Sequence, residues 1–111
     1  MLNSDKMSEI KINKEITDKI QDGTEYKIKN LKFNNNRARL LGIMVINDEE
    51  RDFYIDFENR DRIEYGFKEA KIEKEFKDAL IKFYSDHIVG FEKIEQDENE
   101  NMVLKRKIEI K

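Results

Sequence analysis

The pattern of apolar and polar positions changes along the chain, and each pattern predicts a different kind of element. Between residues 52 and 58 the two kinds of residue alternate one by one. Alternate side chains of a strand lie on the same face, so this segment is expected to be a strand with one buried and one solvated face. The inward set is Phe53, Ile55 and Phe57, and the outward set is Asp52, Tyr54, Asp56 and Glu58. These carboxylates are therefore expected in water.

Four other segments have the composition of strands. They are residues 26–33, 39–46, 87–95 and 102–110. The first changes phase at Asn30, which indicates a β-bulge. The second is an almost continuous apolar run, which is typical of a central strand covered on both faces. Turns are expected at Asn34 to Asn36 and at Asn47 to Glu50, because asparagine and aspartate tolerate the backbone angles of tight turns.

Helical periodicity is strongest from about residue 67 to residue 86. The apolar stripe there consists of Ile72, Phe76, Ala79, Leu80 and Phe83. This spacing places one face of a long helix against the core. Nearer the N-terminus, Ile12, Ile16 and Ile20 are spaced by four, which predicts a short helix from about residue 9 to residue 22. An alternative interpretation takes Glu9 to Ile12 as a short strand.

Together these elements predict an α+β fold in the order α-β-β-β-α-β-β. Connections this short favour antiparallel pairing, so we expect a sheet of about five strands with both helices packed on one face. The 111 residues are expected to form a single domain, 1–111, in which residues 1–8 are loosely ordered.

Composition narrows the functional classes. The 22 basic and 25 acidic residues give a net charge of −3. The chain has no basic tail of the kind that binds nucleic acid or anionic lipid electrostatically. The absence of cysteine excludes disulfides, thiolate catalysis and cysteine-bound metals. The longest apolar run, Leu40 to Ile46, is too short to span a bilayer, and the N-terminal segment lacks the apolar stretch of a signal peptide. We therefore expect a cytoplasmic protein that does not bind membranes.

The candidate catalytic and metal-binding patterns are all incomplete. Calcium loops starting at Asp48 or Asp97 lack the sixth-position glycine and the twelfth-position acid. A metal-dependent nuclease set of Asp48, Glu58 and Arg60 has arginine, which stays protonated, where a lysine is expected. His87, the single histidine, fits a helix C-terminal position stabilised by the helix dipole. We predict no catalytic residue, cofactor or metal site.

These exclusions leave a non-enzymatic protein-binding module as the favoured function. It could act as a small inhibitor, in the manner of immunity proteins or phage proteins that block host defence, by covering its partner with an acidic hairpin. The partner could then be a nucleic-acid-binding protein, because the carboxylates would mimic nucleic-acid charge. The candidate surface comprises Arg39, Asp48, Glu50, Arg51, Asp52, Tyr54, Asp56 and Glu58.

Two alternatives stay open. Arg39 and Arg51 are expected near the two ends of one hairpin, where simple cross-strand ion pairing would also explain them. The open face of the sheet could instead bind single-stranded nucleic acid or a small ligand. An uncovered edge strand, such as the last, could also pair with a second copy of the chain.

Overall fold

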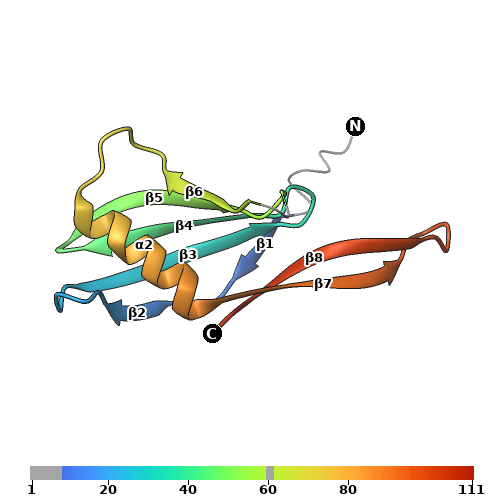
Figure 1. Cartoon of the computed structure of the whole chain (residues 1–111), viewed down its shortest axis with the longest axis horizontal. Coiled ribbons are helices and arrows are strands. Elements are labelled where there is room, and N and C mark those ends of the chain that lie inside the picture. Colours follow the sequence, from blue (N-terminus) through green and yellow to red (C-terminus); the bar gives the residue numbers. More distant parts are fainter. Residues whose placement is uncertain (1–8, 60–61) are drawn as a thin grey trace.

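The computed structural model describes residues 9–59 and 62–111, and in them it shows two antiparallel sheets and one helix (Figure 1). The main sheet has six strands in the order β1-β3-β4-β5-β6, and β2 also pairs with β3. Its strands are β1 (Glu9–Ile12), β2 (Ile16–Lys19), β3 (Glu25–Asn34), β4 (Arg39–Ile46), β5 (Glu49–Asp56) and β6 (Glu64–Phe67). The helix α2 (Lys74–His87) leads directly into a two-stranded sheet of β7 (Ile88–Gln96) and β8 (Met102–Ile110).

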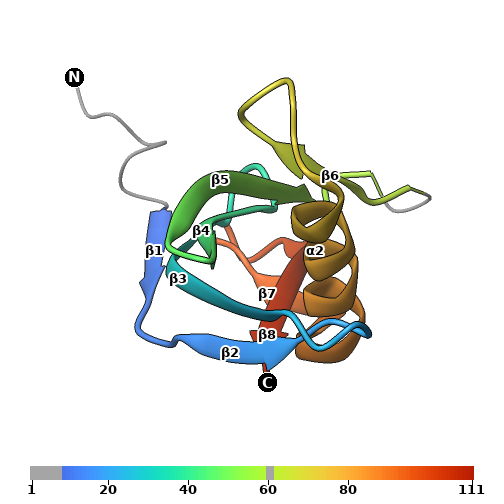
Figure 2. The same cartoon turned by 90° about the vertical axis from the view of Figure 1, so that its left-hand side faces the viewer.

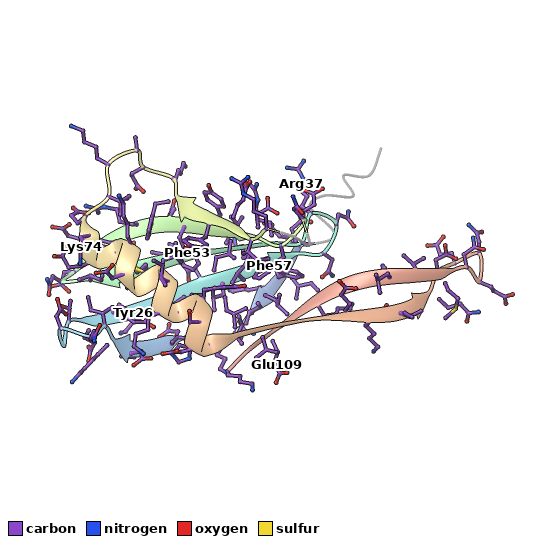
Figure 3. All side chains as sticks on the ribbon, viewed as in Figure 1. Tyr26, Arg37, Phe53, Phe57, Lys74 and Glu109 are labelled. Atoms are coloured by element: carbon purple, nitrogen blue, oxygen red, sulfur yellow. The ribbon has the colours of Figure 1, made fainter. Side chains whose placement is uncertain are left out.

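The core lies between the inner face of the main sheet and α2. Figure 2 shows the sheet curving around this core, with α2 covering its open side. Phe53 of β5 and Phe83 of α2 meet edge to face, with ring centroids 5.8 Å apart. Tyr26 and Phe53 point into the same interior (Figure 3). Burial of such large apolar side chains is the main force that holds the helix to the sheet.

Several local predictions are confirmed. The strand β4 begins and ends where the apolar run does and is central in its sheet, but the prediction that both of its faces are covered is wrong, because one face is buried and the other is partly exposed. In β5 the inward and outward sets are those expected from alternation. The predicted bulge in β3 appears as a register shift between Lys29 and Lys32, with Asn30 at a φ of 55°. Asn47 and Asp48 both have positive φ, as in the two-residue turns that match the twist of a hairpin.

The predicted helix at residues 9–22 is wrong. Those residues form β1 and β2, which pair with the two halves of β3 on either side of its bulge. The alternative strand at Glu9 to Ile12 is therefore correct. The long helix begins at Lys74, later than expected, because Glu64–Phe67 pairs with β5 as an edge strand. Residues 1–8 lie outside the described part of the chain.

The predicted element order and single sheet of about five strands are also wrong, although antiparallel strands and a helix packed on a sheet are confirmed. The described order is six strands, a helix and two further strands. The last two strands leave the main sheet and form a ribbon, here called the arm (residues 88–110). Its far end extends beyond the rest of the molecule (Figure 1), and the whole molecule, arm included, measures 51 × 30 × 25 Å.

Candidate binding surface on the outer face of the sheet

The outer face of the main sheet, which points away from α2, gathers side chains from five strands into rows. Because the strands are antiparallel and in regular register, directly opposite residues point to the same side. One row contains Glu9, Asn34, Arg39, Asp56 and Glu64, and the next contains Lys11, Lys32, Leu41, Tyr54 and Gly66. Ile43 and Asp52 lie opposite each other in a third row, and the backbone NH of Lys68 donates to the carbonyl of Asp52.

A hollow of about 680 Å³ lies across these rows. Leu41, Ile43 and Tyr54 supply its apolar floor. The charged side chains around them are Glu9, Lys11, Lys32, Arg39, Asp52 and Lys68. Four of these are cations and two are carboxylates, so the hollow is locally positive although the whole chain is negative. An apolar floor with a charged rim is the usual composition of a binding surface.

Tyr54 is fixed in position by its neighbours on both sides. The guanidinium carbon of Arg39 lies 5.2 Å from the centroid of the Tyr54 ring, within cation–π distance. On the next strand, a Cβ added to Gly66 would come within 3.1 Å of the Tyr54 hydroxyl oxygen. The absence of a side chain at Gly66 therefore lets the tyrosine ring lie against β6. A ring held this way loses little conformational entropy when a ligand covers it.

Asp56 in turn orients Arg39. Arg39 Nη2 donates to Asp56 Oδ2 over 2.8 Å, between residues directly opposite in β4 and β5. Burial raises the pKa of Asp56, but the hydrogen bonds from Arg39 and from the backbone NH of Glu58 outweigh it and lower the pKa below its usual value. The predicted cross-strand ion pairing of Arg39 is confirmed. The carboxylate is thus a positioning group for Arg39.

The other predicted surface residues lie apart from the hollow. Glu50 forms an ion pair of 2.7 Å with Lys29, and Asp48 is part of the turn between β4 and β5. Glu58 follows the end of β5. Arg51 is on the inner side, where it bonds to Glu49 and Glu73 over 3.0 Å each and lies 5.2 Å from the ring centroid of Phe76. Arg51 therefore fastens the start of α2 to β5 and does not join Arg39 in one patch.

Sequence reasoning selected only Arg39, Asp52 and Tyr54 among the residues that line the hollow and missed the rest. Lys11, Lys32 and Lys68 were not selected, and neither were Leu41 and Ile43. Alternation within β4 would have placed Leu41 and Ile43 on the outer face of the strand, because Leu40 and Met44 are on the buried face. The lysines come from β1, β3 and the segment after β6, so only knowledge of the strand order brings them together.

His87 ends α2, as predicted, and connects three parts of the chain. Its Nε2 lies 2.8 Å from Asp18 Oδ2 in β2, and its Nδ1 donates to the backbone carbonyl of Lys111 over 2.7 Å. Both ring nitrogens are thus occupied by structural partners. Near the tip of the arm, Asp97 accepts hydrogen bonds from the backbone NH groups of Asn99 and Asn101, which is ordinary turn geometry.

Residues 9–59 and 62–111 contain neither a candidate metal cluster nor a helix that could cross a membrane. No three histidine, cysteine, aspartate or glutamate side chains there are grouped closely enough to hold a metal ion. Asp48 and Glu58 flank opposite ends of β5, while Arg60 of the predicted nuclease set lies outside the described residues. No helix in the same ranges has the length and apolar character needed to cross a membrane. Comparisons with protein families, with curated proteins and with solved structures each found no match.

Proposed function

We propose that this chain is a non-enzymatic protein-binding module that covers a partner with the outer face of its main sheet. The observation that carries the proposal is the hollow, whose apolar floor of Leu41, Ile43 and Tyr54 is surrounded by charged side chains. Tyrosine and arginine are the residue types that dominate binding energy in protein interfaces. Tyr54 and Arg39 are already stacked on one another, so binding would not have to order them.

The hollow is a better candidate surface than the whole acidic hairpin. Asp56 is ion-paired with Arg39, and Glu50 is ion-paired with Lys29. An ion-paired carboxylate attracts a basic partner less than an isolated one, because the field of the nearby cation offsets its own. We therefore expect the partner to place an apolar side chain over Tyr54 and carboxylates near Lys11 and Lys32, which line the hollow. Such a module could serve as an inhibitor, because it needs only to occlude a surface.

Selection of binding peptides tests this proposal without a known partner. A random peptide library displayed on phage is selected on the immobilised full chain, and the enriched peptides are measured against variants by calorimetry. We expect peptides rich in apolar and acidic residues, and we expect Tyr54→Ala to weaken them by about 2 kcal/mol or more, roughly thirtyfold.

Tyr65→Ala is the matched control. Tyr65 is a half-exposed tyrosine of β6 that stacks on Tyr84 of α2, on the other side of the sheet. It should leave peptide affinity unchanged. If Tyr54→Ala binds the peptides as well as the original chain does, or if no peptides are enriched, the proposed surface is rejected.

Single-stranded nucleic acid is the second candidate ligand. The observation in its favour is that cations outnumber carboxylates around a partly exposed tyrosine, a combination that binds phosphates and stacks bases. A gel shift at low salt with single-stranded DNA and RNA separates the two candidates. Saturable binding that weakens with salt and is lost in both Tyr54→Ala and Lys32→Glu would replace the protein partner with nucleic acid.

A further inference from the structure

The arm carries an apolar stripe that continues past the core. At its base, Ile88 of β7 and Ile110 of β8 lie opposite each other and are buried. Farther out on the same face, Ile94 lies opposite Leu104, and the two are 62% and 45% exposed. Met102, the last residue of the stripe, is 68% exposed. The outer part of the arm extends beyond the other elements (Figures 1 and 3), so none of the described residues covers the end of the stripe.

The outer edge of β7 is available for strand pairing. Within the described chain, β7 and β8 pair only with each other. Two backbone hydrogen bonds flank the ribbon: Lys111 NH donates to the His87 carbonyl, and Asp97 NH donates to the Asn101 carbonyl. The residues just before and just after β7 that form them, His87 and Asp97, are both odd-numbered. Register is unbroken between them. Because backbone groups alternate in direction along a strand, the NH and carbonyl of Ile94 point away from β8.

Charge is separated along the arm. Three lysines lie in its middle, where Lys93 is directly opposite Lys105 and Lys107 is 2.9 Å from Glu95. Carboxylates collect toward the tip, namely Glu95, Asp97, Glu98 and Glu100. Like charges directly opposite each other destabilise a strand pair. The middle of the arm would therefore gain from carboxylates placed beside Lys93.

We propose that two copies of this chain pair through the β7 edges of their arms, antiparallel, with a two-fold axis at Ile94. In that register Lys93 of each copy lies opposite Glu95 of the other, giving two new ion pairs. The acidic tip of each arm then lies beside the lysines of the second copy. Axes at Glu92, Lys93 or Glu95 would each place two identical charges opposite one another, so Ile94 is the favourable centre.

The same arrangement explains the exposed stripe. A two-fold axis perpendicular to the ribbon keeps both apolar faces on one side. Ile94 would then contact Ile94 of the second copy, and Leu104 would flank the pair in each copy. The result is a four-stranded sheet in place of two isolated hairpins, and isolated two-stranded hairpins are only marginally stable. This inference is independent of the outer-face hollow and of its partner.

Charge-swapped variants test the register. Lys93→Glu places glutamate opposite Glu95 in a pair of identical copies, and Glu95→Lys places lysine opposite Lys93. Sedimentation equilibrium should show a dimer for the original chain and weaken it about tenfold or more in each variant. An equimolar mixture of the two variants should form a heterodimer, because both cross-copy pairs are then of opposite charge.

The matched controls are charge reversals of the same size at positions away from the proposed contact between the two copies. Lys77→Glu on α2 and Glu25→Lys on β3 are both exposed and lie outside the arm, and neither should alter the dimer. Circular dichroism checks that all variants fold. A monomeric original chain at millimolar concentration would overturn the proposal, and so would a dimer that both swaps leave intact.

A thiol cross-link locates the axis directly. The chain has no cysteine, so Ile94→Cys introduces a single thiol. A short bis-maleimide should join two copies at this position. Met102→Cys serves as the control, because the two Met102 positions would be roughly 20 Å apart by strand spacing and rise. Equal cross-linking at both positions, or none at Ile94→Cys, would reject the two-fold axis.

Discussion

At Gly42 the inner face of β4 has no room for a side chain. A Cβ there would lie 2.7 Å from Cζ of Phe53, the residue directly opposite, and 3.0 Å from Cδ2 of Leu31. Gly42→Ala should therefore force the Phe53 ring to move and lower the free energy of unfolding by about 1–3 kcal/mol. Urea unfolding measures the change.

Gly90→Ala is the natural comparison for Gly42→Ala. An added Cβ at Gly90 meets nothing within 4 Å, so stability should change by less than about 0.5 kcal/mol. Replacing Phe53 with leucine in the Gly42→Ala background should cost less than the two single changes added together. Equal effects of alanine at both glycines would show that ring contact does not explain Gly42.

Individual residues show what alternation can and cannot predict. The outward position of Tyr54 follows from its neighbours Phe53 and Ile55, because strand geometry fixes it locally. The contact of Tyr54 with Arg39 lies within the hairpin of β4 and β5, whereas its contact beside Gly66 depends on β6 lying next to β5. The sequence therefore predicted the tyrosine and its neighbour Arg39 but not the strand on its other side.

At the scale of elements, the N-terminal segment shows why the predicted helix was wrong. Ile12, Ile16 and Ile20 are four residues apart, and an interval of four places side chains on one face of a strand as well as of a helix. Ile16 and Ile20 are indeed buried, so the apolar face was predicted correctly but the element type was not. β6 was missed because it has only four residues, too few for its alternation to stand out beside the helical stripe that follows.

Asp18 joins β2 to α2, and its titration should affect the stability of the fold. Hydrogen bonds from His87, from the backbone NH of Lys19 and from Lys82 lower the pKa of Asp18 to about 2, although burial opposes them. The folded-state pKa is below the ordinary value of 3.8, so the carboxylate stabilises the fold fully above that value. This contribution is lost as pH falls through the folded-state pKa.

The variant Asp18→Asn should abolish that part of the acid sensitivity. Unfolding free energies measured from about pH 5 down to about pH 2 should fall more steeply for the original chain than for Asp18→Asn. Asp48→Asn, at a turn that tolerates asparagine, should leave the steep fall unchanged. Parallel curves for the original chain and Asp18→Asn would exclude Asp18 as the cause.

For the whole molecule, the pairing of strands far apart in sequence decided what could be predicted. β4 and β5 were correct because a two-residue turn joins them and pairing is local. The separation of β7 and β8 from the main sheet was not predicted, since their alternation is equally suited to a sheet edge. The exposure of Ile94 and Met102 is a consequence of this separation and is visible only in the structure.

The arm should open independently of the rest of the molecule in dilute solution. Beyond its buried base it has two strands and lacks a helix or second sheet among the described residues to stabilise it, whereas β3 and β4 are central strands of the main sheet. We expect amide hydrogens near Lys93 and Lys105 to exchange with solvent at least about 100-fold faster than those of β4.

If the arms of two copies pair, raising the protein concentration should slow exchange at the β7 edge, with Ile94 the most protected. Lys93→Glu should remove this concentration dependence and leave exchange in β4 unchanged. Exchange in the arm as slow as in β4 at the lowest concentration would mean that the ribbon is stable by itself, and its exposed stripe would then need another explanation.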